Sequence, residues 1–364
     1  MKSNPRLDRL RESMNIEAVD LVALGPGAHL AWLTGVSPHA DERPLLFCIT
    51  QSYAGFLMPV LEADSARQQT QDLPFHTWSD ADGPESALKD CLMAAGASGA
   101  KSIVLDETMR ADFAALVQDR LPDARRQFTA STIGALRMRK DNHEYELLKS
   151  NALIADRAMV AAWDSMQIGM TESEVAEVVR ESFKSQNAVP LFHIIGAGGN
   201  GAFPHHHTSD TKIKQGDIVV MDIGGGQHGY SSDMTRMASM GPPPDDYESV
   251  HNIVEHAVQA AMQAAKPGVK AHVVDDAARK VITDAGYGEL FMHRTGHGMG
   301  VEIHETPYIT SSSQSILEEG MVFSIEPGIY QSDKYGLRLE DIVILRADGP
   351  EVFSELPRDL KIIE

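Results

Sequence analysis

The stretch "DIVVMDIGGGQHGYSSDMTR", residues 217–236, joins an apolar run to a cluster of glycines. Gly224, Gly226 and Gly229 match the pattern G-x-G-x-x-G, which marks a nucleotide site only where the glycines open a helix whose N-terminal N–H groups hold phosphate. The residues that follow, "YSSDMTRMASMGPPP", lack an apolar stripe at helical spacing and end in three prolines. A nucleotide-binding helix is therefore not expected here.

The same stretch is better interpreted as a β-hairpin with its tip at Gln227 and His228. Equal offsets from this tip place Asp222 directly opposite Asp233, where side chains of paired strands lie close together on one face. Two carboxylates at that separation repel each other, so that either one of them holds a proton or a cation lies between them.

Length and composition indicate a globular chain of two domains. The 364 residues are 43% hydrophobic, which is enough for a large core. The formal net charge of −20 disfavours nucleic acid and anionic membranes as partners. The first twenty residues are charged and lack the apolar core of a signal peptide, so we expect a cytoplasmic protein. Cys48 and Cys91 lie in apolar settings and are expected to be buried thiols.

The order of the expected elements places the domain boundary near Ser131. Helical patterns and strand-like runs alternate over residues 1–130, which predicts an α/β layer domain. Thr171 and Glu174 then form a capping box ahead of an amphipathic helix. Two further helices are predicted, and strands with glycine-rich turns fill four other segments, so the second domain is α+β. The two helices span 247–268 and 271–286, and the four segments are 192–205, 217–236, 293–304 and 321–345.

Three histidines lie in "HRTGHGMGVEIHE", residues 293–305: His293, His297 and His304. A spacing of four would bring His293 and His297 to one face of a helix, as in zinc proteases. Several glycines between and beyond them make that helix poor, so an extended or looped ligand segment is expected.

Two carboxylates accompany apolar strands further on, Glu326 in "VFSIEPGIY" and Glu340 in "LRLEDIVIL". A lone buried charge is strongly destabilising, so both need a partner. Together with Asp222 and Asp233 they make four carboxylates, and His297 adds an imidazole; two divalent cations would balance this set. Oxygen-rich ligation suits Mn²⁺, while Zn²⁺, Co²⁺ and Fe²⁺ stay possible. Two such ions about 3.5–4 Å apart can generate hydroxide and polarise a carbonyl.

Taken together, "MDIGGGQHGYSSDMTR", "TGHGMGVEIHE", "SIEPGIY" and "RLED" resemble the metal-site motifs of the Xaa-Pro dipeptidase and aminopeptidase P group. These proteins are relatives of methionine aminopeptidase and creatinase. The resemblance covers nearly the whole chain and implies an α/β, creatinase-like N-terminal domain at 1–130, followed by an α+β pita-bread catalytic domain at 131–364. It further implies cleavage of the Xaa-Pro bond at the N-terminus of dipeptides or short peptides, and a homodimer.

The resemblance also implies a role for each metal ligand. Asp222 would bind one metal ion, His297 and Glu326 the other, and Asp233 and Glu340 would bridge the two. Glu326 also resembles the group that takes the proton from the nucleophilic water.

Four more residues match family positions around the substrate. His205, in "AFPHHH", corresponds to a histidine near the substrate, and His304 to one that contacts the substrate and the tetrahedral intermediate. His293 would line the pocket. Arg338 would orient Glu340 by charge-assisted hydrogen bonding or touch the substrate.

Simpler interpretations apply to several residues taken alone. His206 and His207 are assigned to the surface or core, and Tyr230 either packs in the hairpin or supports the metal site, as a tyrosine does in the family. Methionine aminopeptidases share the ligands but usually lack so large an N-terminal domain; creatinases and non-catalytic binding lobes have lost ligands that this chain keeps. The alternatives are a lyase, or a hydrolase of another small amide, on the same metal site, and a non-catalytic peptide-binding protein of the same fold.

One position departs from the family pattern. Dipeptidases of the group commonly carry arginine in a segment like "HExPR", where it holds the free carboxylate of a dipeptide, whereas this chain reads "HETPYI" with Tyr308 at that place. We therefore expect longer Xaa-Pro peptides to compete with dipeptides or surpass them, unless Arg338 or His205 takes over the carboxylate.

Overall fold

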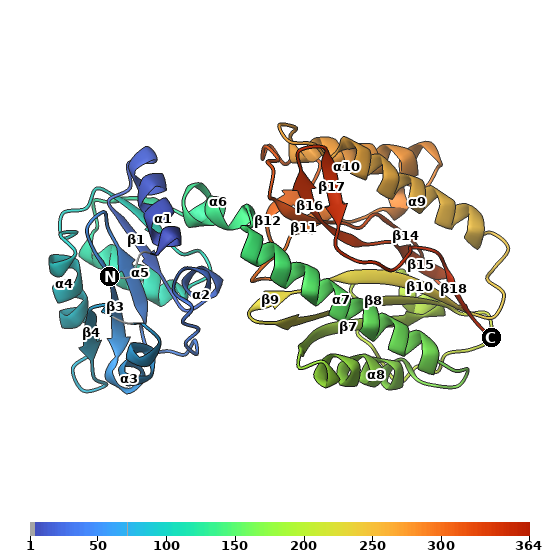
Figure 1. Ribbon diagram of the computed structural model, residues 1–364, viewed down its shortest axis with the longest axis horizontal. Coiled ribbons are helices and arrows are strands. Elements are labelled where there is room, and N and C mark those ends of the chain that lie inside the picture. The colour runs from blue at the N-terminus through green and yellow to red at the C-terminus, as the bar shows by residue number, and fades with distance from the viewer. Residues whose placement is uncertain (1–3, 71) are drawn as a thin grey trace. The chain divides into compact units, whose positions relative to one another are not determined.

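The computed structural model describes residues 4–70 and 72–364 and consists of two compact units, Met1–Arg137 and Met138–Glu364 (Figure 1). An α/β N-terminal unit followed by an α+β unit is the fold class predicted from the sequence, and the structure confirms it. The two compact units meet between Arg137 and Met138, within helix α6 (Ile133–Met138), and the domain boundary near Ser131 stays a prediction.

The first unit is built on a six-stranded sheet of order β4-β3-β2-β1-β5-β6. β1 pairs with β5 in parallel and with β2 in antiparallel orientation. Cys48 and Cys91 are free and lie in the core of this unit, as expected for buried thiols. The strands are β1 (Leu21–Leu24), β2 (Leu46–Ile49), β3 (Ala54–Pro59), β4 (Phe75–Trp78), β5 (Ser102–Leu105) and β6 (Arg125–Gln127). The helices are α1 (Pro5–Ile16), α2 (Ala28–Thr34), α3 (Val60–Gln69), α4 (Glu85–Ala94), α5 (Ala111–Arg120) and the short η1 (Thr129–Ser131).

Capping boxes begin two of the helices of the second unit. The Thr171 side chain accepts a hydrogen bond from the Glu174 N–H and the Glu174 carboxylate accepts one from the Thr171 N–H, so the predicted capping box is confirmed. Asp141 and Glu144 form a second capping box, which begins α7 after the break that follows α6. The helices are α7 (Asn142–Ser165), α8 (Glu172–Ser185), α9 (Tyr247–Ala264) and α10 (Ala271–Asp284), with the short η2 (Gly198–Ala202) and η3 (Gly288–Leu290).

Two sheets occupy the interior of the second unit, ordered β18-β10-β8-β7 and β12-β11-β13-β16-β17, with β9 paired to β8 and a separate pair β14-β15. Figure 1 shows α8, in green, on the opposite side of the strands from α9 and α10, in gold and orange. The strands are β7 (Val189–Ala197), β8 (Ile218–Gln227), β9 (Tyr230–Ser231), β10 (Met234–Met240), β11 (Gly296–Gly298), β12 (Glu305–Ile309), β13 (Val322–Ile325), β14 (Gly328–Gln331), β15 (Tyr335–Arg338), β16 (Asp341–Arg346), β17 (Gly349–Val352) and β18 (Lys361–Ile363).

Strand β8 is buried on both faces, and its alternation decides where its aspartate points. Val219 and Met221 pack in the cluster with α7 and α8, while Ile218 and Val220 pack in the cluster with α9 and α10. Side chains two residues apart share a face of a strand. Asp222 therefore lies on the same face as Val220, away from α7 and α8.

The hairpin of β8 and β10 is present, but its tip lies one residue further along the chain than predicted, which moves the partner of Asp222 by two residues. Asp222 lies opposite Thr235 rather than Asp233. The turn is made by His228 and Gly229, with φ values of 56° and 79°, as a two-residue turn of type I′ requires. The prediction placed the tip midway between the two aspartates. The register is instead set by the residues that can adopt the positive φ values of the turn. Asp233 is then a diagonal neighbour of Asp222.

The glycines of this hairpin serve close packing and a turn. A Cβ atom on Gly224 would lie 2.1 Å from Cε1 of Phe192, and one on Gly225 would lie 2.4 Å from the ring of Phe183. Gly229 belongs to the turn. No helix follows these glycines directly, because the chain enters β9 and then β10. The expectation that the motif is not a nucleotide-binding loop agrees with this arrangement.

Candidate metal centre

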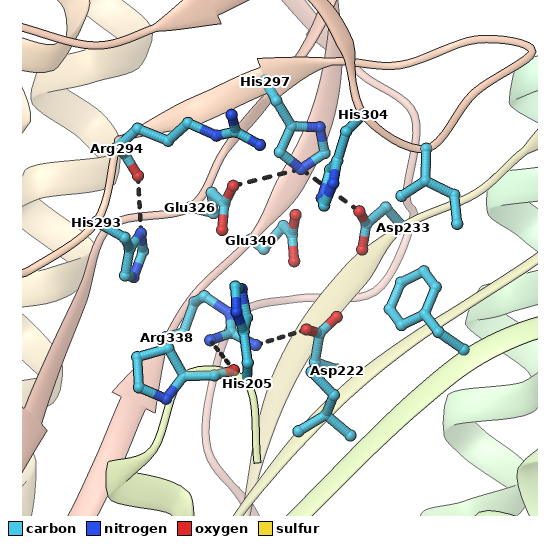
Figure 2. Close-up of a pocket in the computed structure, with 14 residues that line it drawn as sticks. His205, Asp222, Asp233, His293, Arg294, His297, His304, Glu326, Arg338 and Glu340 are labelled. Carbon is cyan, nitrogen blue, oxygen red and sulfur yellow. Dashed lines mark hydrogen bonds and ion pairs between the residues drawn. The ribbon is translucent and has the colours of Figure 1, made fainter. Parts of the chain in front are cut away.

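A cavity of about 710 Å³ in the second unit is lined by all of the site residues that the sequence singled out (Figure 2). Its apolar wall consists of Phe192, Ile194, Pro204 and Ile303, and Arg294 lines it as well. The predicted residues in its lining are His205, Asp222, Asp233, His293, His297, His304, Glu326, Arg338 and Glu340.

The five predicted metal ligands come from two sheets. Asp222 is in β8 and Asp233 lies between β9 and β10, whereas His297 is in β11, Glu326 directly follows β13 and Glu340 directly precedes β16. The extended ligand segment expected around His297 is thus a strand, with close neighbours on both sides. A Cβ atom on either glycine beside His297 would lie 1.9–2.2 Å from a backbone oxygen of a neighbouring strand.

His297 is held in the tautomer that a metal ligand needs. Its Nδ1–H donates to the Gly298 carbonyl at 3.1 Å, and its backbone N–H donates to Ser324 Oγ at 2.9 Å. Nε2 therefore carries the lone pair, and it lies 3.6 Å from Asp233 Oδ2 and 3.4 Å from Glu326 Oε1. Burial, and next His304, lowers the pKa of His297 to about 3, so the ring is neutral at physiological pH.

The ligand atoms fall into two overlapping clusters. Asp222, Asp233 and Glu340 form one, and His297, Glu326 and Glu340 form the other; within each cluster the ligand atoms lie within 4.8 Å of one another. Glu340 belongs to both. Asp222 Oδ1 is buried and has no hydrogen-bond partner among the described residues.

Burial disfavours the ionised form of these carboxylates. Burial raises the pKa of Glu326 to about 7. The pKa values of Asp233 and Glu340 lie well above their usual range, first because of burial and then because of neighbouring carboxylates. Divalent cations would neutralise the charges and supply the missing partner of Asp222. Carboxylate oxygens with one neutral imidazole are a donor set that suits such ions, so the residues present fit a dinuclear centre.

Arg338 supports the carboxylates from one side of the cavity. Its guanidinium donates to Asp222 Oδ2 at 2.6 Å, to the Tyr330 hydroxyl at 2.8 Å and to Thr235 Oγ1 at 3.0 Å. Thr235 in turn donates to Glu340 Oε2 at 2.7 Å. The predicted link between Arg338 and Glu340 is therefore indirect and runs through Thr235, while the direct carboxylate partner is Asp222.

The three predicted histidines around the ligands differ in how far their ring nitrogens are engaged. In His293, Nδ1–H donates to the Arg294 carbonyl at 2.7 Å, and Nε2 accepts from Tyr330 at 2.8 Å. Both of its nitrogens are thus occupied by protein groups. His304 packs edge-on against His297, with ring centroids 4.2 Å apart, and it is exposed, as is His205. These two rings are free to meet a substrate.

Several supporting residues were not found from the sequence. Thr235 and Tyr330 are two of them. A third is Arg236, fully buried in β10, which donates to the Glu340 carbonyl, to Asp341 Oδ1 and to three groups of the segment 354–357. The sequence feature that could have indicated Arg236 is a cation within an otherwise apolar strand. The partners are distant in sequence, so the pattern could not name them.

Two residues given simpler interpretations have defined partners. His206 is partly buried, and its Nε2 lies 2.8 Å from Glu172 Oε2. Glu172 also accepts from the Ala197 N–H and from Ser209, so it holds the segment that carries His205. Tyr230, in β9 of the hairpin, packs in a buried hydrophobic cluster, and its hydroxyl donates to Glu144 Oε1 at 2.7 Å, which joins β9 to the start of α7.

Comparison with known families decides the relationship. Residues 146–347 match the model of metallopeptidase family M24, and residues 6–139 match the creatinase/prolidase N-terminal domain. The chain belongs to metallopeptidase family M24. It is therefore a metal-dependent peptidase that holds divalent metal ions.

Relatives in this family match over almost the full length of the chain. The Xaa-Pro dipeptidase of Pyrococcus horikoshii is 31% identical over 359 residues, which covers 98% of this chain and 99% of that protein. The crystal structure of dipeptidase PepE from Mycobacterium ulcerans superposes with a TM-score of 0.93 at 33% identity, over 99% of this chain and 97% of that one. The crystal structure of a prolidase from Thermococcus sibiricus superposes with a TM-score of 0.91 at 31% identity. The match covers 100% of this chain and 99% of that one. Within residues 4–70 and 72–364, none of the helices has the length and apolar character needed to cross a bilayer.

Proposed function

We propose that this M24 peptidase hydrolyses the Xaa-Pro bond at the N-terminus of dipeptides or short peptides, using two divalent metal ions, of which Mn²⁺ is preferred. The observation that carries the proposal is the pair of ligand clusters that share Glu340 within one substrate-sized cavity. The similarity to an Xaa-Pro dipeptidase and to a prolidase supports the substrate class.

In this proposal Asp222 would hold one ion, His297 and Glu326 would hold the other, and Asp233 and Glu340 would be shared between the two sites. When bound, the ions supply Lewis acidity to the scissile carbonyl and make water acidic enough to attack near neutral pH. The Asp233 oxygen 3.6 Å from His297 Nε2 supports its bridging role, because it reaches both clusters.

The chain's own groups complete the reaction. Glu326 accepts the proton of the attacking water and passes it toward the leaving imino nitrogen. The exposed imidazoles of His205 and His304 donate hydrogen bonds to the substrate at the mouth of the ligand clusters. His293 has both nitrogens engaged, so we assign it to positioning Tyr330 and, through it, Arg338. The apolar wall of the cavity receives the proline ring.

We further propose that the enzyme acts as a homodimer in the cytoplasm, with short proline-containing peptides rather than nucleic acid or membrane as its partners. The net charge of −20 supports the last part, because it repels polyanions. Closed two-fold assemblies are the commonest oligomers of soluble proteins.

The test is a metal-reconstitution assay. Protein stripped with a chelator is titrated with Mn²⁺, Zn²⁺, Co²⁺ or Fe²⁺, and hydrolysis of Ala-Pro and Ala-Pro-Ala is compared with that of Ala-Ala and of a methionyl peptide. We expect metal-dependent release of alanine from the proline-containing peptides only. Equal cleavage of Ala-Ala, or selective cleavage of the methionyl peptide, would contradict the specificity, and a metal-loaded protein inert toward all four would contradict the proposed reaction.

A further inference from the structure

Arg294 has an unusual position among the residues of the cavity. Of the two arginines in the lining, Arg338 is engaged with Asp222, Tyr330 and Thr235. The Arg294 guanidinium, by contrast, makes no hydrogen bond or ion pair with any part of the chain that the structure describes. Its side chain extends into the cavity toward Glu326 and His297 in Figure 2. Arg294 is therefore a half-buried cation that is available to a ligand.

The ring of Tyr308 supports this guanidinium. Cζ of Arg294 lies 4.7 Å from the centre of the Tyr308 ring, within the range of a cation–π contact. Tyr308 pairs with His297 across β12 and β11, so its side chain lies on the same face as that ligand. It is 39% exposed, which places the stacked pair beside the ligands, at the border between the protein interior and solvent.

The backbone around Arg294 is fixed on both sides. Its carbonyl accepts the bond from His293 Nδ1, and the next residue, Thr295, donates from both its N–H and its hydroxyl to the buried Asp275. The base of the side chain is anchored by these bonds and its flat end rests on an aromatic ring. A guanidinium held in this way presents its remaining N–H groups as a preorganised fork.

The ligand that fits this fork is a carboxylate. A guanidinium binds a carboxylate through two parallel N–H···O bonds, and partial burial strengthens both. An Xaa-Pro dipeptide carries one carboxylate, at its C-terminal proline, only a few bonds from the scissile carbonyl. We propose that Arg294, supported by Tyr308, binds the free C-terminal carboxylate of a dipeptide substrate. This inference rests on the proposed function.

Tyr308, at the position where related dipeptidases commonly have arginine, then has a role in substrate binding. The tyrosine is the platform, and the cation comes from the neighbouring segment of the chain. Arg338 cannot take this role without leaving Asp222 and Thr235. The dipeptide is then a better substrate than a peptide whose proline carboxylate is blocked, which reverses the expectation drawn from Tyr308 alone.

The experiment compares Ala-Pro with its amide, Ala-Pro-NH₂, in metal-loaded wild type, Arg294→Met and Arg294→Lys. The readout is the ratio of kcat/KM for the acid to kcat/KM for the amide, because a general loss of activity cancels in it. We expect the ratio to fall roughly 10- to 100-fold in Arg294→Met, mainly through KM for the acid, as loss of a charge-assisted bidentate contact implies. Arg294→Lys keeps the charge without the fork of N–H donors, so its ratio should lie between those of wild type and Arg294→Met.

Two variants of the platform provide matched controls. Tyr308→Phe keeps the ring and should keep most of the ratio, whereas Tyr308→Leu removes the ring and should lower it. Calorimetric binding of L-proline against prolinamide to the same proteins gives a readout that is independent of turnover, and Arg294→Met should lose the preference for the acid.

The outcomes separate the two hypotheses. A wild type that hydrolyses neither Ala-Pro nor its amide overturns the proposed function. A wild type that hydrolyses Ala-Pro, with a ratio that Arg294→Met leaves unchanged, overturns the carboxylate assignment alone. Equal losses for acid and amide would mean that Arg294 acts only through the field it exerts on the metal ligands.

Discussion

Loss of the Thr235 hydroxyl should weaken metal binding at the proposed centre. Thr235 Oγ1 donates to Glu340 at 2.7 Å and accepts from Arg338 at 3.0 Å, and the Thr235 side chain is fully buried. Valine has nearly the same shape and no hydroxyl. Thr235→Val therefore leaves packing almost unchanged while it removes one hydrogen bond from each of two charged groups.

The size of the effect follows from these two contacts. A hydrogen bond to a charged group contributes about 1.5–3 kcal/mol. Arg338 keeps Asp222 and Tyr330 as acceptors, so most of the loss falls on Glu340, which belongs to both ligand clusters. At about 1.4 kcal/mol per tenfold change, the affinity for Mn²⁺ should fall about 10- to 100-fold, which is the range found for outer hydrogen-bond partners of metal ligands.

The assay is competition for Mn²⁺ against a fluorescent chelator, with wild type, Thr235→Val and Thr235→Ser measured side by side. Thr235→Ser retains the hydroxyl and should stay close to wild type. If Thr235→Val binds Mn²⁺ as tightly as wild type, the hydroxyl does not orient Glu340. If Thr235→Ser is weakened as much as Thr235→Val, the methyl group rather than the hydrogen bond is responsible.

Three further predictions address metal loading, assembly and pH. Asp233→Asn replaces a proposed bridging carboxylate with a neutral amide, so bound metal should decrease by elemental analysis and activity should fall more than about 100-fold; full activity in a metal-free preparation would contradict the dinuclear reaction. Light scattering should show a homodimer, and a monomer with full activity would argue against it. Burial, and next Arg137, lowers the pKa of His29 to about 3 from 6.5, so the unfolded chain binds the proton first as pH falls. Between pH 7 and 5 the free energy of unfolding of wild type should thus drop about 2 kcal/mol more than that of His29→Gln in urea titrations, and equal drops would refute the assignment.

The metal ligands could be predicted because an acidic residue within or beside an apolar strand has few explanations. Glu326 and Glu340 satisfy that condition, and the charge balance with Asp222, Asp233 and His297 favoured two ions. The structure brings all five together, although their individual roles are still predictions. The capping box of Thr171 could also be predicted from the sequence, because Thr171 and Glu174 lie within one helical turn of each other.

Contacts between distant segments could not be predicted in the same way. Thr235 and Glu340 are 105 positions apart, and nothing local to either names the other. The predicted pairing of the hairpin was wrong by two residues because His228, a residue other than glycine, adopts the left-handed conformation and the turn lies one position further along the chain. Arg294 was overlooked because its significance depends on the aromatic ring of Tyr308, which lies in strand β12.

Arg236 has a practical consequence for anyone who shortens this chain. Three of its hydrogen-bond acceptors lie in Ser354, Leu356 and Pro357, and the same guanidinium holds the carbonyl of Glu340. Deleting the stretch from 354 onward would strip a fully buried cation of about half its acceptors. The deletion would therefore disturb the position of Glu340, a proposed metal ligand, and not only the new C-terminus. Affinity tags on this protein are therefore better appended after Glu364 than substituted for the residues that precede it.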